Sequence, residues 1–218
     1  MKLRVNKAAS SIQAAVSEAD MQAINRYTLR ELTPEEVFVF RCVACDDQVD
    51  RDFERFPVET LRKLASLFEG RTVIRDHRWS AEGQQARIFA AAVENRNGVN
   101  ALVVDCYMMR TAETLDTIAA IEGGILREVS VGCIVARTVC SICGEDGYTC
   151  AHLKGHVYDG KTCYYDLLDP LDAYELSFVA VPAQPGAGVT KETHESCWTP
   201  AQMDAAKVRL EIERERWK

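Results

Sequence analysis

Histidine is scarce in this chain, and the position of one histidine relative to one serine could support chemistry. Four histidines occur among the 218 residues. His152 and His156 lie within a cluster of cysteines, and His194 lies in a polar tail. His77 therefore remains as the imidazole that could act as a general base toward Ser130.

A serine hydroxyl is a poor nucleophile at neutral pH and needs a base, usually a histidine, within hydrogen-bond distance. Such assistance is worth about 10²-fold to 10⁴-fold in rate. His77 follows the short segment 72–76, and Ser130 lies in a second one, 128–132. The two residue types alone favour the ordinary alternative, in which a carbonyl binds the histidine and the backbone binds the serine.

Strand alternation predicts which side chains near these residues share a face. Around Ser130, the flanking valines share one face, whereas Ser130 and Gly132 share the other. In the later segment 174–179, Glu175 and Ser177 project together. The side chains expected on the opposite face are Tyr174, Leu176 and Phe178. We therefore expect each strand to present a polar group on a face that a substrate can reach.

The other apolar segments predict a series of short elements. We expect strands at 37–43, 72–76, 87–93, 99–107, 125–135, 163–168 and 174–181. We expect helices at 17–27, 57–68 and 112–122, with Leu115, Ile118 and Ala119 of the last facing inward. Asn97-Gly98 predicts a hairpin, and Gly70 predicts a helix end. These elements predict an α+β fold, a small, mostly antiparallel β-sheet or β-barrel with a few flanking helices.

Length and composition predict one domain with an appendage. Residues 1–190 suffice for a single core with a cysteine-rich insert at 138–163, and 191–218 read as a linker and a charged C-terminal helix. The net charge of −7, without a basic stripe, argues against nucleic acid as a direct ligand. No segment approaches the roughly 18–20 apolar residues that span a bilayer, and the N-terminus lacks the apolar run of a signal peptide. We expect a cytoplasmic protein.

Nine cysteines, an odd number, indicate thiols and metal ligands rather than disulfides. Cys140-x-x-Cys143 followed by Gly144 makes a tight turn that can offer two thiolates to one ion, and Cys150 with His152 completes a Cys₃His set. Four protein ligands leave no open position, so the metal would be structural, and zinc fits best. Its binding would contribute about 10 to 16 kcal/mol to ordering the insert.

Other readings of the cysteines stay open. Cys163 and His156 are spare candidates for the fourth ligand, and the alternatives to a structural ion are a catalytic zinc or a loop with incidental thiols. Cys42 and Cys45 also have the Cys-x-x-Cys spacing. Residues three apart in a strand point to opposite faces, so this pair is expected to be two unrelated thiols.

Four segments occur in a characteristic order: Val49-Asp50-Arg51-Asp52, Asp76-His77, Glu128-Val129-Ser130-Val131-Gly132 after a helix that ends in Gly-Gly, and the segment 175–187, which contains Pro-Ala-Gln-Pro. In this order and spacing, the chain from about residue 37 to 190 resembles the caudovirus prohead proteases. These are capsid-maturation serine proteases whose fold is shared with the herpesvirus assemblin. The resemblance implies an assemblin-like fold.

The resemblance also implies roles for individual residues. Ser130 would be the nucleophile and His77 the general base. Glu175 would be the acidic third member, with Asp172 as the alternative. Asp76 is a poor candidate to orient the histidine, because neighbours in an extended strand point apart.

Two further questions concern the residues around Ser130. A backbone N–H near Gly132 is the expected oxyanion donor. A cysteine enzyme that uses Cys133 or Cys106 is another alternative, although Cys133 is expected on the apolar face of its strand.

The resemblance implies a serine endopeptidase that cleaves scaffold and major capsid proteins through an acyl-enzyme, inside a phage procapsid assembling in the host cytoplasm. Self-association is expected, and neither nucleic acid nor a membrane is expected as a direct partner. The C-terminal helix, 199–218, would pack on the domain or on a second copy; alternatively, it docks on capsid or scaffold and is removed by self-cleavage. The alternative function is a non-catalytic assembly or scaffold module with the same fold.

Overall fold

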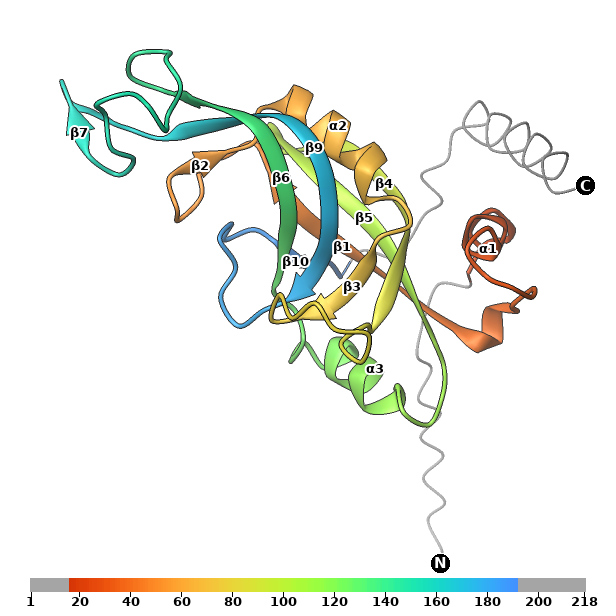
Figure 1. Cartoon of the computed structure of the whole chain (residues 1–218). Coiled ribbons are helices and arrows are strands. Elements are labelled where there is room, and N and C mark those ends of the chain that lie inside the picture. Colours follow the sequence, from red (N-terminus) through yellow and green to blue (C-terminus); the bar gives the residue numbers. More distant parts are fainter. Residues whose placement is uncertain (1–15, 192–218) are drawn as a thin grey trace, which may run out of the picture.

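The computed structural model describes residues 16–191, which form an eight-stranded mixed sheet with helices beside it (Figure 1). The strands of this sheet are β1 (Val37–Asp46), β2 (Glu54–Arg55), β3 (Thr72–Arg75), β4 (Ala86–Arg96), β5 (Val99–Met109), β6 (Val129–Cys140), β9 (Tyr165–Phe178) and β10 (Gly188–Val189). The helices within this range are α1 (Glu18–Asn25), α2 (Val58–Phe68), α3 (Leu115–Glu122) and the 3₁₀ turn η1 (Pro34–Glu36). The predicted α+β class is confirmed, and the helix predicted at 199–218 lies outside the described residues.

The sheet is mixed and does not close into a barrel, so the barrel form of the prediction is wrong. Its strand order is β10-β1-β5-β4-β3-β9-β2, with β6 paired to β9. Most pairs are antiparallel, but β2 and β3 run parallel to β9. One isolated bridge, Glu128 to Gly188, links the start of β6 to β10. This bridge is too short to extend the ladder around the sheet.

Strands β6 and β9 form one long antiparallel ladder, visible as a curved pair of ribbons in Figure 1. Strand β9 joins the segments 163–168 and 174–181, which the sequence predicts as separate strands. Pro170, which cannot donate a hydrogen bond to the ladder, lies within β9. The ladder tolerates it through a register shift between Ile134 and Val135, and a second shift lies between Gly132 and Cys133.

Helix α2 covers the centre of the sheet and forms as predicted. Leu61, Leu64 and Phe68 lie on one face of the helix and are fully buried. They join the main core, which is built mainly from β1, β4, β5, β6 and β9. The helix ends before Gly70, whose φ of 81° is the left-handed conformation that favours glycine.

Two smaller helices also pack against the sheet, α1 against β4 and α3 against the main core. Helix α1 falls within the predicted segment 17–27, and its Met21 and Ile24 are buried. In α3, Leu115 and Ala119 are exposed, contrary to the prediction. The buried face of α3 is set by Ile118 together with Thr117 and Ile121 in the adjoining turns, so positions 115 and 119 fall outside it. Within residues 16–191, no helix is both long and apolar enough to cross a membrane.

The turn between β4 and β5 forms as predicted. Asn97 has a φ of 54° and Gly98 a φ of 90°. Positive φ at both central residues is the conformation of the two-residue hairpin turn that Asn-Gly favours. Arg96 is paired with Val99, which fixes the register of both long strands.

Candidate functional site: a histidine–glutamate pair and a cysteine cluster

His77 lies in a sharp turn that directly follows β3. Asp76 and His77 both have a φ of 52°, so neither continues the extended strand. The amide of Asp76 donates to the carbonyl of Phe178 (3.0 Å), and the amide of His77 donates to Oγ of Ser177 (2.8 Å). Both partners lie on β9. These two bonds hold the histidine against β9 at the end of its parallel pairing with β3.

The ring of His77 contacts the carboxylate of Glu175. Nδ1 of His77 lies 2.8 Å from Oε1 of Glu175, whose side chain is 2% exposed, whereas the histidine side chain is 43% exposed. A carboxylate accepts this hydrogen bond, so Nδ1 carries the proton and Nε2 is left as the basic atom. This is the geometry in which an acid orients a general base.

Asp172, the alternative acid, has other partners. Its Oδ1 accepts hydrogen bonds from Nη2 of Arg71 (2.6 Å) and from the amide of Ala173 (2.9 Å). Of the two acids left open by the sequence, Glu175 is the one that contacts His77.

Gly132 makes room for this carboxylate. It lies opposite Glu175 in the ladder between β6 and β9. A Cβ atom at this position would lie 2.1 Å from Oε1 of Glu175 and 2.9 Å from its carboxyl carbon. The structure shows that any larger residue would collide with the partner of the histidine.

Ser130 lies on β6, one strand away from the residue that binds the amide of His77. It is directly opposite Ser177 in the ladder and is partly exposed. Facing residues of antiparallel strands have Cα atoms about 4.5–5.5 Å apart. Among the described residues, the Ser130 hydroxyl forms no hydrogen bond with His77. In enzymes without substrate, such bonds are often long and shorten on binding.

Two expectations about the polar faces are wrong. Glu175 and Ser177 are 2% and 0% exposed, because the turn at His77 covers this part of β9. Tyr174 is 37% exposed instead of pointing into the core with Leu176. The register shift beside Gly132 leaves Tyr174 without a partner on β6, and a bulge of this kind breaks the alternation.

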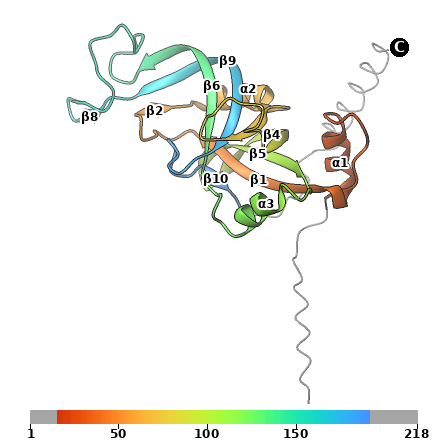
Figure 2. The ribbon, with the colours of Figure 1, turned by 60° about the horizontal axis from the view of Figure 1, so that its bottom comes forward.

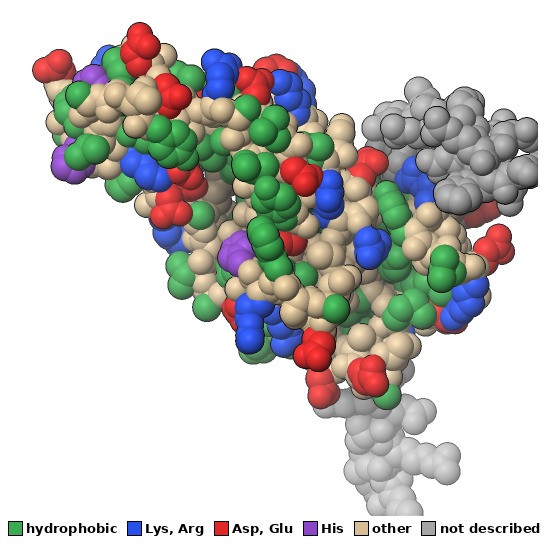
Figure 3. Space-filling view, in the orientation of Figure 1, with side chains coloured by type: hydrophobic (Ala, Val, Ile, Leu, Met, Phe, Trp, Pro, Cys, Tyr) green, Lys and Arg blue, Asp and Glu red, His purple; other side chains and the backbone are tan. Residues whose placement is uncertain are grey.

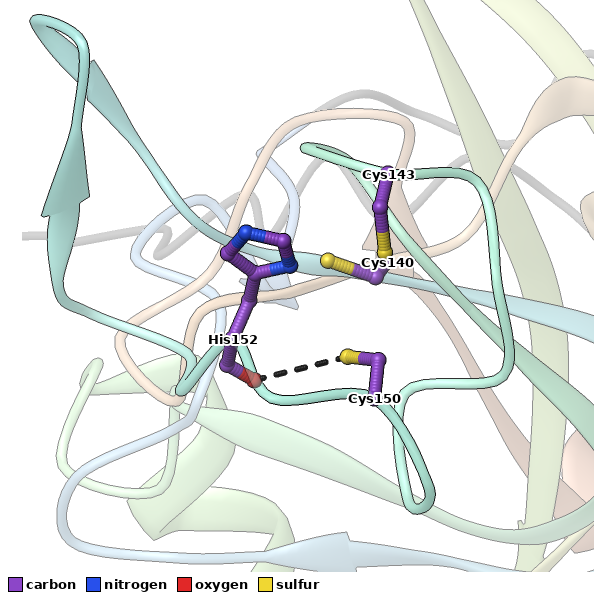
Figure 4. A group of neighbouring side chains, drawn as sticks. All are labelled: Cys140, Cys143, Cys150 and His152. Carbon is purple, nitrogen blue, oxygen red and sulfur yellow. Dashed lines mark hydrogen bonds between the residues drawn. The ribbon is translucent and has the colours of Figure 1, made fainter.

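A second candidate site lies where β6 ends. One ligand atom from each of Cys140, Cys143, Cys150 and His152 lies within 4.8 Å of all the others, so this predicted set could hold a metal ion. Figure 4 shows the cysteine side chains around a common space, with one ring nitrogen of His152 turned toward the sulfur of Cys140. Around a tetrahedral zinc, sulfur ligands lie about 3.8 Å apart, as Zn–S bonds of about 2.3 Å require.

The local environment of these residues suits a cation. Nδ1 of His152 is buried and has no hydrogen-bond partner, an arrangement that is costly unless something binds the nitrogen. Burial disfavours the thiolate of Cys140 more than any other single effect, but hydrogen bonds from the amides of Cys143 and Ile142 and from neighbouring thiols lower its pKa to about 6. The amide of Ile142 lies 3.4 Å from the Cys140 sulfur.

The two spare ligand candidates differ in their positions. Sγ of Cys163 is buried and lies 3.7 Å from Sγ of Cys140. His156 is exposed and lies outside the group of four. Cys163 is therefore the alternative that geometry supports.

The cysteine cluster belongs to an ordered insert between β6 and β9 that ends in a hairpin of β7 (Val157–Tyr158) and β8 (Lys161–Thr162). Nζ of Lys154 binds Oε1 of Glu54 at 2.5 Å, and the ring of Phe53 packs against Gly155. Figures 1 and 2 show the hairpin at the end of β6 and β9 away from α3. Cys140 is ten positions along β6 from Ser130, roughly 30 Å at strand spacing.

The remaining cysteines mentioned above lie in strands. Cys42 and Cys45 are both buried in β1 and belong to no group of candidate metal ligands among the described residues. Cys133 packs against the main core, as its expected position on the apolar face requires. Burial raises the pKa of Cys133 to about 11, and the carboxylates of Glu54 and Glu175 add to this effect. It is therefore a poor nucleophile at neutral pH.

In comparisons with known proteins, the chain matches no family model and no curated sequence.

The local geometry adds one residue that sequence reasoning missed. Ser177 was noted only as a polar neighbour of Glu175, yet its hydroxyl fixes the backbone of His77. The only signal in the sequence was its position two residues after Glu175 in an apolar strand.

Proposed function

We propose that this protein is a serine endopeptidase in which Ser130, His77 and Glu175 act together. The observation that supports this most strongly is the 2.8 Å contact between Nδ1 of His77 and a buried carboxylate oxygen of Glu175. That contact orients the ring and leaves Nε2 as the proton acceptor. Ser130, which is partly exposed, lies on β6, the strand paired with the one that carries Glu175.

In the proposed reaction, Oγ of Ser130 attacks the carbonyl carbon of a peptide bond while Nε2 of His77 takes the hydroxyl proton. The imidazolium then gives this proton to the leaving amine as the peptide bond breaks, and an acyl-enzyme remains on Ser130. Water attacks the acyl group by the same route and regenerates the serine. Glu175 stabilises the imidazolium that forms twice in each cycle. An amide near Gly132 as the oxyanion donor stays a prediction.

The proposed substrates are the scaffold and major capsid proteins of a phage procapsid. Support for this part comes from the order of the four sequence segments that resemble the prohead proteases. One of these segments also has a structural role. Gln184 is buried and its Nε2 donates to the carbonyl of Asp46 (3.0 Å), which anchors the segment after β9 to β1. An assemblin-like arrangement and self-association belong to the same proposal.

We further propose that Cys140, Cys143, Cys150 and His152 bind one structural zinc ion. Support comes from the proximity of the four ligand atoms and from the unpartnered, buried Nδ1 of His152. When bound, zinc would supply a cross-link for an insert with a small apolar cluster of its own. The length of β6 between Cys140 and Ser130 favours a structural over a catalytic role.

The alternative function is an assembly or scaffold module that keeps the fold without cleavage. The observation that favours it is the lack of a hydrogen bond between Ser130 and His77 among the described residues. Such a module would bind capsid or scaffold protein and leave it uncut.

Co-expression separates the two functions. The full chain is produced with its major capsid and scaffold proteins, beside Ser130→Ala and the control Ser66→Ala, which changes an exposed serine of α2. We expect shortened capsid or scaffold chains with wild type and with Ser66→Ala, and uncut chains with Ser130→Ala. Identical uncut chains in all three cultures would reject the protease and favour the module.

A further inference from the structure

An exposed aromatic pair lies beside the histidine–glutamate pair. Trp79 is two residues beyond His77 and is 72% exposed, and Tyr174 adjoins Glu175 in β9. The ring centroids of Trp79 and Tyr174 are 5.2 Å apart with an interplanar angle of 57°. Single exposed apolar side chains are common, but exposed apolar side chains that lie together often mark a binding site.

The bulges in the ladder between β6 and β9 extend this pair into a patch. Tyr174 has no partner on β6, and Leu171 is likewise skipped at the second register shift. Leu171 is 63% exposed, and Ile134, on the same face of β6 as Ser130, is 44% exposed. Figure 3 shows hydrophobic side chains running over β6 and β9 next to a histidine. We call Trp79, Tyr174, Ile134 and Leu171 the apolar patch.

We propose that the apolar patch is a subsite that binds an apolar side chain of the peptide substrate, close to the bond that Ser130 attacks. This inference rests on the proposed protease function. An extended peptide advances about 3.3 Å per residue. Ile134 is four residues along β6 from Ser130, or about 13 Å, so the patch lies within the span of a few substrate residues.

The size of the patch favours a substrate side chain over a folded partner. A stable protein–protein interface buries about 800 Å² on each partner, and four partly exposed side chains offer much less. The positions of the two aromatic residues also favour a substrate side chain, because Trp79 shares its loop with His77 and Tyr174 is next to Glu175. An apolar side chain packed against the two rings would add binding energy for the substrate near Ser130, in the ground state and the transition state alike.

The test uses the full-length protein and a peptide library made by tryptic digestion of a bacterial lysate, with cut sites identified by mass spectrometry. We expect wild-type cut sites to share an apolar residue at one fixed position within about three residues of the cut. Trp79→Ala and Tyr174→Ala should lose this preference, and kcat/KM on the best peptide should fall roughly ten-fold to 100-fold, mainly through KM. Trp79→Phe should retain the preference.

Two controls separate binding from chemistry. The rate at which a fluorophosphonate modifies Ser130 should change less than about two-fold in Trp79→Ala, because this reagent needs the base but not the patch. Leu29→Ala removes another exposed apolar side chain, beyond α1, and should behave as wild type.

The outcomes are distinct. If wild type cuts peptides but shows no apolar preference, or if both alanine variants keep it with unchanged kcat/KM, the subsite is rejected and the protease stands. If wild type neither cuts peptides nor reacts at Ser130, the proposed function fails, and the subsite fails with it.

Discussion

Nδ1 of His77 and Oε1 of Glu175 lie 2.8 Å apart although 98 positions separate the two residues in the chain. The parallel pairing of β3 with β9 brings them together, and Ser177 fixes the histidine backbone from the same strand. Glu175 is almost fully buried, and its Oε2 has no hydrogen-bond partner. A buried carboxylate is costly unless it is paired. The hydrogen bond with His77 is therefore the main interaction that offsets the cost of burying Glu175.

Replacing the buried acid tests its role in orienting the base. Glu175→Gln keeps the size of the side chain but removes the charge that stabilises the imidazolium. We expect kcat to fall between about 10²-fold and 10⁴-fold, with KM nearly unchanged. Asp172→Asn, which changes the acid paired with Arg71, should lose less than about two-fold. Peptide-cleavage kinetics on both variants check this, and the reverse pattern would transfer the role to Asp172.

Gly132 should tolerate no side chain. Gly132→Ala places a Cβ atom within 2.1 Å of Oε1 of Glu175, so the carboxylate must move away from His77. We expect loss of cleavage together with a decrease of about 1–3 kcal/mol in the free energy of unfolding, as is typical of overpacking. Gly186→Ala is the control, because a Cβ there would be 3.4 Å from its nearest neighbour, Oδ2 of Asp46. Urea unfolding and cleavage assays on both variants measure the effects.

Local signals in the sequence predicted local features well. Asn97-Gly98 gave the hairpin, and the apolar face of α2 gave the central helix. Features that depend on distant strands were not predictable in this way. The sequence predicted two strands, 163–168 and 174–181, yet they join into the single strand β9 because the long strand β6 pairs along both. Burial of Glu175 depends on a turn about 100 residues earlier, which strand alternation cannot describe.

The candidate site shows the same contrast between features predicted from local sequence and features that depend on distant strands. The sequence singled out His77, Ser130 and Glu175, and the structure brings His77 and Glu175 into contact. The sequence alone could not choose between Glu175 and Asp172, because both lie in the same strand and their partners come from elsewhere in the chain. The exposure of Tyr174 was missed because it results from a bulge.

Metal analysis tests the cysteine cluster. Protein purified without chelator should contain about one zinc per chain, and Cys143→Ser should lose it. Chelation should make the insert between β6 and β9 sensitive to limited proteolysis while fluorophosphonate modification of Ser130 continues, because the two sites are roughly 30 Å apart along β6. A metal content near zero in fresh wild-type protein would reject the zinc proposal.

The fourth zinc ligand can be assigned by comparing two substitutions. His152→Ala should reduce zinc affinity strongly, whereas Cys163→Ser should have a smaller effect if Cys163 only neighbours Cys140. Competition with a chromogenic chelator measures both affinities. The opposite order would place Cys163 in the ligand set and His152 outside it.

Cys133 should be dispensable for catalysis. Its pKa of about 11 leaves roughly one thiol in a thousand ionised at pH 8, so alkylation should be slow. We expect little modification of Cys133 by iodoacetamide at pH 8, and Cys133→Ala should retain most of the cleavage activity. Peptide mapping after alkylation provides the measurement. Rapid alkylation of Cys133 with parallel loss of activity would instead support a cysteine enzyme.

The most direct measurement is modification of the full chain by a fluorophosphonate, followed by intact-mass and peptide mass spectrometry. The reagent forms a bond between phosphorus and Oγ of an activated serine, and fluoride leaves. We predict one phosphonyl group per wild-type chain, located on Ser130, with the rate reduced at least about 10²-fold in His77→Ala and Glu175→Gln. Absence of modification at Ser130 under conditions that support capsid assembly, or a rate unaffected by the loss of His77, would contradict a Ser130–His77–Glu175 site.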